Sequence, residues 1–257
     1  MLRIEIDKNV AVLSLNRPPV NALNMQMVAD LAQAARDLSE KSMASKVRCV
    51  VIRSQCQHFC AGADLKERKN SAVENVAVTV LKIQQAMTAI ASIPVPVIAA
   101  INGAAIGGGL ELALAADIRL AADDAKMGLR ETALGIIPGA GGTQRLARLI
   151  GPAQALYWIA SAKIFSAQEA LSFGVVQKVD STEKLLDAAM NLAFEIAANA
   201  PVALRAAKQA IFQGIEKPLK DGLALEHEFY KTTVDTADRV EALNAFFEKR
   251  MPRFNGN

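Results

Sequence analysis

The chain has 257 residues, of which 52% are hydrophobic and 21% are charged. A chain of this length and composition buries a sizeable core, which excludes an intrinsically disordered protein. Its formal net charge is +3, from 29 basic and 26 acidic side chains, and this balance is too even to indicate a polyanionic partner.

Strand patterns alternate with helix patterns in the first half of the chain. Short β-rich or continuously apolar runs predict strands, and apolar residues at helical spacing predict helices. In chain order we expect strands over residues 2–6 and 10–15, a helix over 25–40, a strand over 47–52, a loop over 54–69, a helix over 72–92 and a strand over 95–100. The run 47–52 is almost continuously apolar, which predicts burial on both faces.

Helices dominate the second half. We expect a helix over residues 110–115 that begins at three glycines, a strand over 118–121, helices over 143–150 and 153–161, a helix capped by Ser166, and nearly continuous helix from residue 183. Glu169 lies three residues after Ser166 and completes a capping box. The pattern predicts an α/β core with a helical C-terminal portion.

The chain opens with a strand pattern, so we expect no signal peptide. Its most apolar stretches, residues 93–101 and 104–116, fall short of the roughly 18 uncharged residues of a membrane span. We therefore expect a cytoplasmic protein, with the mitochondrial matrix as the alternative if a targeting peptide has been removed.

Three cysteines suit a reducing compartment better than a disulfide framework. Cys56, His58 and Cys60 alternate, so a zinc site is conceivable, but a fourth ligand is hard to find because the other histidine is His227. Buried or loop thiols are the preferred interpretation, and no metal is expected.

Residues 60–66 form the first segment of functional interest. The small side chains of Ala61, Gly62 and Ala63 would let a ligand approach the backbone closely. A tight surface turn would favour the same residue types, and the residues alone leave both interpretations open.

Residues 102–111 form the second segment. Gly107, Gly108 and Gly109 open a helix, where amides without intrahelical partners can hold an oxyanion or a carbonyl oxygen. Glu111 follows among apolar neighbours, where an unpaired carboxylate is costly. It is therefore either paired or functional, unless it faces solvent from an amphipathic helix.

The third segment places Glu131 ahead of a glycine-rich turn over residues 135–144. That turn lacks the lysine of a phosphate-binding P-loop and the sixth-position glycine of the dinucleotide fingerprint. Close backbone packing is the better explanation. Together the three segments supply two amides that could polarise a thioester carbonyl and two carboxylates that could move protons.

At this point the sequence resembles the enoyl-CoA hydratase/isomerase, or crotonase, family. The motifs that carry the resemblance lie at residues 16–18, 21–23, 59–66, 96–103, 107–113, 135–146, 238–239 and 245–250. They span nearly the whole chain. Residues 63–68 and 134–151 look like the methylglutaconyl-CoA hydratase branch, which indicates a short or branched acyl chain.

The resemblance implies a crotonase-like spiral of ββα units, an α/β core over residues 1–195 and a helical trimerisation region over 196–257. It implies a homotrimer or a hexamer built as a dimer of trimers, and no cofactor beyond the coenzyme A of the substrate. The implied site consists of catalytic Glu111 and Glu131, the oxyanion-hole amides of Ala63 and Gly108, substrate-binding Ala61, Asp64, Leu65 and Lys66, and coenzyme A contacts from Phe246 and Lys249.

The activity implied is addition of water to a 2-enoyl-CoA, a lyase reaction of fatty acid β-oxidation. Glu111 would direct the water to C3 and Glu131 would protonate C2. A Δ3,Δ2-enoyl-CoA isomerase is the nearest alternative, since it needs one carboxylate. Arg130 departs from the apolar residue or proline that often precedes the second glutamate, which could alter the charge near the acyl tail.

Two alternatives are not enzymes. One relative in the methylglutaconyl branch binds RNA, and Lys41, Lys46, Arg48 and Arg53 form a modest basic cluster. Aromatic residues make up only 5% of the chain and form no stacking motif, so nucleic acid is not an expected partner. The other alternative is an inactive acyl-CoA-binding scaffold, which the presence of both glutamates disfavours.

Overall fold

The structure is a computed structural model that describes residues 1–69 and 72–257. Its strands are β1 (Leu2–Asp7), β2 (Val10–Leu15), β3 (Cys49–Ser54), β4 (Val97–Ile101), β5 (Ala104–Ile106), β6 (Ile118–Ala122), β7 (Lys126–Gly128), β8 (Phe165–Ser166) and β9 (Lys178–Asp180). Its helices are α1 (Met25–Met43), α2 (Leu65–Lys69), α3 (Val73–Ala91), α4 (Gly108–Ala115), the 3-10 helix η1 (Glu131–Leu134), α5 (Gly142–Ile150), α6 (Pro152–Ala160), α7 (Ala167–Ser172), α8 (Leu185–Ala197), α9 (Pro201–Gly214), α10 (Leu219–Val234) and α11 (Ala237–Phe247).

The larger sheet has the strand order β1-β2-β3-β4-β6-β9. Strand β1 pairs with β2 in antiparallel fashion, and the remaining neighbours are parallel. All of β4 and the first four residues of β3 are buried. Parallel strands covered on both faces require such apolar runs, so the prediction of a doubly buried strand here is confirmed.

A small second sheet has the order β5-β7-β8. In it Ile106 of β5 is the partner of Gly128 of β7, and the Gly107 amide donates to the Gly128 carbonyl at 2.8 Å. Strand β5 leads directly into α4, and β7 leads into η1. This pairing therefore brings two segments some twenty residues apart to the same place. Three-residue strands have no visible periodicity, and the sequence did not reveal either of them.

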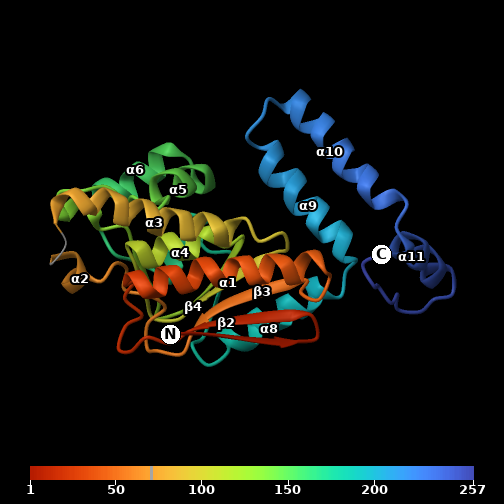
Figure 1. The fold of residues 1–257 in the computed structure, drawn as a ribbon, viewed down its shortest axis with the longest axis horizontal. Coiled ribbons are helices and arrows are strands. Elements are labelled where there is room, and N and C mark those ends of the chain that lie inside the picture. Colours follow the sequence, from red (N-terminus) through yellow and green to blue (C-terminus); the bar gives the residue numbers. More distant parts are fainter. Residues whose placement is uncertain (70–71) are drawn as a thin grey trace.

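Helices cover both faces of the larger sheet. Helices α1, α3 and α4 form one layer, and α8 packs against β3 and β4 from the other side (Figure 1). The apolar face expected for α1 is buried and includes Met27, Leu31 and Leu38. An α/β core followed by helices is confirmed by this architecture.

The last three helices extend away from the core. Helices α9 and α10 pack against each other and α11 follows them (Figure 1). Lys208 attaches α9 to the core, because its buried ammonium group donates to Asp117 at 2.7 Å and to the Val95 carbonyl at 3.1 Å. Arg48 donates to the Phe254 carbonyl at 2.7 Å, which fixes the C-terminal tail.

Two local predictions have opposite outcomes. The capping box of Ser166 and Glu169 is present. The prediction of loop throughout residues 54–69 is wrong, because the chain forms α2 at Leu65–Lys69. Asp64 Oδ1 accepts the amides of Lys66 at 3.0 Å and Glu67 at 3.3 Å, so a side-chain cap nucleates a helix too short to show periodicity.

All three cysteines are free thiols. Within residues 1–69 and 72–257, no helix has the length and apolar character required to cross a membrane.

Candidate active site

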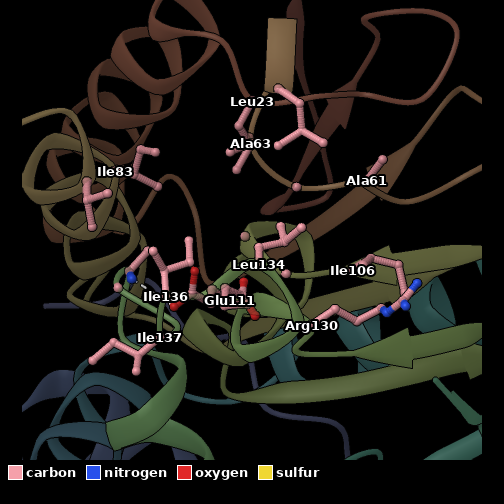
Figure 2. Close-up of a pocket in the computed structure, with 18 of the residues that line it drawn as sticks. Leu23, Ala61, Ala63, Ile83, Ile106, Glu111, Arg130, Leu134, Ile136 and Ile137 are labelled. Carbon is pink, nitrogen blue, oxygen red and sulfur yellow. Dashed lines mark hydrogen bonds between the residues drawn. The ribbon is translucent and has the colours of Figure 1, made fainter. Parts of the chain in front are cut away.

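A cavity of about 370 Å³ lies where the start of α4 meets residues 61–65, α3 and the segment from η1 to α5. Its walls are mainly apolar, and Glu111, Arg130 and Glu131 are the charged residues among them (Figure 2). The lining residues are Leu23, Ala61, Gly62, Ala63, Leu65, Val80, Ile83, Ile106, Gly107, Gly108, Glu111, Arg130, Glu131, Ala133, Leu134, Ile136, Ile137, Gly139 and Ala140.

The glycines at the start of α4 permit a close approach between two backbone segments. Gly107 has φ +54°, a conformation that L side chains rarely adopt. A Cβ atom on Gly109 would lie 1.9 Å from the Cys60 carbonyl oxygen, so any side chain there would push α4 away from the segment that contains Ala63. Glycine is therefore required at position 107 by the backbone conformation and at position 109 by the close approach of Cys60.

Ala63 and Gly108 both line the cavity, and their backbone nitrogens are near each other. A Cβ atom built on Gly108 would lie 3.6 Å from the Ala63 nitrogen, and one built on Gly62 would lie 3.2 Å from the Gly108 nitrogen. Among the hydrogen bonds of the described residues, neither amide is a donor to a loop, cap or side-chain acceptor. Gly108 is also the first residue of α4, where an amide has no intrahelical acceptor.

Glu111 is buried within α4 and is only 3% exposed. Its Oε1 accepts the Ala140 amide at 2.7 Å and the Gly142 amide at 2.8 Å. Burial is the main cause that raises the pKa of Glu111, and the nearby negative charge of Glu131 adds to it, while the two amides and Arg145 lower it; the balance places the pKa at about 7. Such a group exchanges its proton near neutral pH.

Glu131 is the first residue of η1 and is half-buried. Its carboxylate lies against the start of α4, since a Cβ atom on Gly107 would be 2.8 Å from its Oε1. Side chains on both sides of Glu131 hold this turn. Thr132 Oγ1 donates to the Ile159 carbonyl at 2.7 Å and Arg130 Nε donates to the Ala162 carbonyl at 3.2 Å.

The other predicted contact residues have three different positions. Ala61 and Leu65 line the cavity. Asp64 lines a smaller neighbouring pocket instead, and Arg17 holds it through an ion pair of 2.8 Å that lowers the pKa of the carboxyl group. Lys66 is exposed and lines neither pocket.

Phe246 and Lys249 lie outside this cavity. Phe246 belongs to α11 and is 76% exposed, and Lys249 follows the same helix. The structure therefore brings Ala61, Ala63, Leu65, Gly108, Glu111 and Glu131 to one cavity within the chain, and it leaves the two C-terminal residues apart from them.

Sequence reasoning missed the apolar walls, which include Leu23, Val80, Ile83, Leu134, Ile136 and Ile137. An apolar residue has the same sequence pattern whether it faces a core or a cavity. Arg130, which directly precedes η1, also lines the cavity, and its side chain extends toward Ile106 (Figure 2).

Other polar clusters in the chain have structural partners. The Cys60 thiol donates to the Asn21 carbonyl, and burial raises its pKa to about 12. Nowhere in the described part of the chain do three His, Cys, Asp or Glu residues gather as a metal site. Two residues of the basic cluster are held internally, since Arg48 donates to backbone carbonyls and Arg53 donates to Ser14 Oγ at 2.9 Å.

Comparison with known proteins gives a consistent result. The model of the family described as enoyl-CoA hydratase/isomerase matches residues 5–257. The mitochondrial methylglutaconyl-CoA hydratase of Mus musculus is 48% identical over 258 residues, which cover 98% of this chain and 81% of that protein. The mitochondrial enoyl-CoA hydratase domain-containing protein 2 of Bos taurus is 43% identical over 256 residues, covering 97% of this chain and 86% of that protein.

Solved structures show the same fold. The crystal structure of enoyl-CoA hydratase from Bacillus anthracis superposes with a TM-score of 0.96 at 42% identity and covers 100% of this chain and 99% of its own.

Proposed function

Because the chain belongs to the enoyl-CoA hydratase/isomerase family and is an enzyme of its hydratase type, we propose that the cavity between α4 and η1 is its active site. There it adds water across the double bond of a 2-enoyl-CoA thioester to give a 3-hydroxyacyl-CoA. One observation carries the proposal: Glu111 and Glu131 line the same cavity as the neighbouring amides of Ala63 and Gly108.

The two amides form the proposed oxyanion hole. The thioester oxygen accepts hydrogen bonds from Ala63 and Gly108, and the positive end of the α4 dipole adds to the second bond. Electron density then moves from the double bond toward this oxygen, which leaves C3 open to attack by water.

The two carboxylates share the proton transfers. Glu111 in its ionised form accepts a proton from the water as the oxygen bonds to C3, and Glu131 in its protonated form gives a proton to C2. Glu111 thus gains a proton and Glu131 loses one, and the substrate gains one water molecule. A proton returns from Glu111 to Glu131, directly or through solvent, before the next turnover. The pKa of about 7 of Glu111 suits a group that gains and loses a proton near neutral pH.

The proposed substrate class is a 2-enoyl-CoA with a short or branched acyl chain. The mouse relative is named for methylglutaconyl-CoA, and methylglutaconyl-CoA is accordingly the first specific candidate. The apolar side chains of Ile83, Ile136 and Ile137 would surround the acyl group in a cavity of about 370 Å³. No cofactor beyond coenzyme A, as part of the substrate, enters this scheme.

The C-terminal helices are the proposed trimerisation region, residues 196–257, and residues 1–195 the catalytic core. Helices α10 and α11 expose large apolar side chains, namely Leu219, Leu223, Tyr230, Val240, Leu243, Phe246 and Phe247. Burial of these groups in a homotrimer or a dimer of trimers would remove them from water. Phe246 and Lys249 would then contact the coenzyme A bound by a neighbouring subunit.

For the compartment we propose the cytoplasm, with the mitochondrial matrix as the alternative that the name of the mouse relative supports.

Turnover of a panel of coenzyme A esters tests the proposal. We expect loss of enoyl absorbance with crotonyl-CoA, 3-methylcrotonyl-CoA or methylglutaconyl-CoA, and slower conversion of a 3-enoyl-CoA. Faster conversion of the 3-enoyl-CoA would identify an isomerase instead, and turnover of none of these esters would contradict the proposal.

A further inference from the structure

Arg145 is a half-buried residue of α5 that does not line the active-site cavity. Its Nη1 donates to the Ala140 carbonyl at 3.0 Å, and its Nη2 donates to Thr88 Oγ1 of α3 at 3.3 Å. Both of these acceptors are neutral oxygen atoms, so neither of them neutralises the guanidinium charge.

The same turn that Arg145 contacts also holds Glu111. Ala140 gives its carbonyl to Arg145 and its amide to Glu111, and the Gly142 amide is the second donor to the same carboxylate oxygen. The guanidinium packs directly on the turn, since a Cβ atom on Gly141 would lie 2.0 Å from Arg145 Nη1. Arg145 and Glu111 are therefore joined through one short piece of backbone.

The charges of the two residues also interact. The guanidinium of Arg145 lowers the pKa of Glu111, and it opposes the rise that burial and Glu131 cause. A cation that is half-buried acts more strongly than one in water, because less solvent screens it.

We propose that Arg145 is a positioning residue of the hydration reaction, which holds the Ala140–Gly142 turn so that both amides keep the Glu111 carboxylate in place as the base. This inference rests on the proposed function. The role is indirect, because the chain from Arg145 to the reacting water passes through Ala140 and Glu111.

The proposal predicts a change in pH dependence. Without Arg145 the carboxylate loses a nearby positive charge and the firm orientation of its two donors, so its pKa rises. The ionised base then forms only at higher pH. In the pH profile of kcat/KM, the acidic limb of the parent protein should have its midpoint near pH 7. In the variant this midpoint moves toward alkaline pH.

The test compares Arg145→Met with Arg148→Met over pH 5 to 9. Arg148 is a matched control on the same helix, since it is exposed and pairs with Glu216 at 2.8 Å. We expect the midpoint of the acidic limb of Arg145→Met to move up by at least about half a pH unit. Relative to the parent, the loss of kcat/KM at pH 6 should exceed the loss at pH 9 by more than about threefold. Arg148→Met should keep the parent profile.

Arg145→Lys provides a second variant that retains the charge. It should give a smaller shift than Arg145→Met, and it keeps the test open if the methionine variant does not fold. A uniform loss of activity at all pH values, with the limb unmoved within about 0.2 pH units in both variants, would overturn the proposal.

A second measurement separates this inference from the proposed function. The side-chain carboxyl of Glu111 can be titrated by ¹³C NMR in protein labelled at glutamate, with Glu111→Gln identifying the resonance. If the parent protein hydrates no enoyl-CoA, the proposed function fails, but a higher pKa of Glu111 in Arg145→Met would still support the link between the two residues. An unchanged pKa would contradict it even in an active enzyme.

Discussion

The two segments that supply the carboxylates are built differently. Helix α4 encloses Glu111 among buried residues and the backbone amides of Ala140 and Gly142 hold it, whereas η1 is a four-residue turn in which Glu131 is half-buried. Backbone amides fix the carboxylate of Glu111. The turn that carries Glu131 is fixed instead by its neighbouring side chains, which donate to carbonyls of α6 and of the loop after it. One cavity thus combines a buried carboxyl group whose pKa is near 7 with a second carboxyl group on a more exposed wall.

Removal of either carboxylate should have the largest effect. Because both take part in proton transfer in the proposed reaction, we expect Glu111→Gln and Glu131→Gln to lower kcat by about 10²–10⁴ while the fold survives. Steady-state hydration of crotonyl-CoA or methylglutaconyl-CoA measures this effect, and circular dichroism checks the fold. Turnover within about threefold of the parent in both variants would remove the assignment.

The next effect concerns the amide at the start of α4. Gly108→Pro removes one proposed oxyanion donor and should cost on the order of 3 kcal/mol in kcat/KM, a loss of roughly 100-fold. Gly108→Ala is the matched control because it keeps the amide, and its Cβ atom would meet mainly the flexible Leu23 Cδ1 at 3.1 Å. Equal losses in the two variants would show that the side chain, and not the amide, accounts for the effect.

The burial of Glu111 should also be visible in stability. The pKa of Glu111 is raised from 4.5 to about 7 in the folded protein, so the folded state binds this proton more tightly than the unfolded state. The stability that follows from this difference is fully present below pH 4.5 and is lost as pH rises through about 7. Glu111→Gln, which cannot ionise, should be more stable than the parent by up to about 3 kcal/mol at pH 8 and by less than about 1 kcal/mol at pH 5. Urea denaturation at both pH values measures the difference, and a gap that does not change with pH would contradict the raised pKa.

The smallest effect should appear in η1. Thr132→Val removes the hydrogen bond to the Ile159 carbonyl, and we expect a stability loss of about 1 kcal/mol and a several-fold loss of kcat as Glu131 loses its fixed position. The acidic limb near pH 7 should remain in place, because Glu111 is untouched. Thr143→Val, at a half-buried position of the next helix whose hydroxyl accepts from the adjacent Gln144 side chain, is a suitable control. A shift of the limb would mean that the two carboxylates are not held independently.

Much of the fold could be predicted from local patterns. Periodicity located α1, α3 and the buried strands β3 and β4, since these elements are long or continuously apolar. Strands β5 and β7 could not be predicted, because each has three residues and their pairing depends on contacts distant in sequence. Those two strands are what bring Glu131 to α4.

The candidate site was predictable where a residue conflicts with its surroundings. Glu111 stands out as a carboxylate in an apolar helix, and the glycines before it stand out as costly in a helix start. Glu131 became a candidate chiefly through family resemblance. Arg145 lies within the family motif at residues 135–146, but the residue pattern assigned it no role, because a half-buried charged residue on an amphipathic helix has the same pattern as one that faces solvent.

A crystal structure with a bound 3-oxoacyl-CoA, which has no 2,3 double bond to hydrate, tests the central claim most directly. We predict that the thioester oxygen accepts hydrogen bonds from the Ala63 and Gly108 amides, within about 3.1 Å of each nitrogen. C3 should then face the carboxylates of Glu111 and Glu131. A thioester oxygen bound elsewhere, or an acyl chain that leaves C3 remote from both glutamates, would contradict the account.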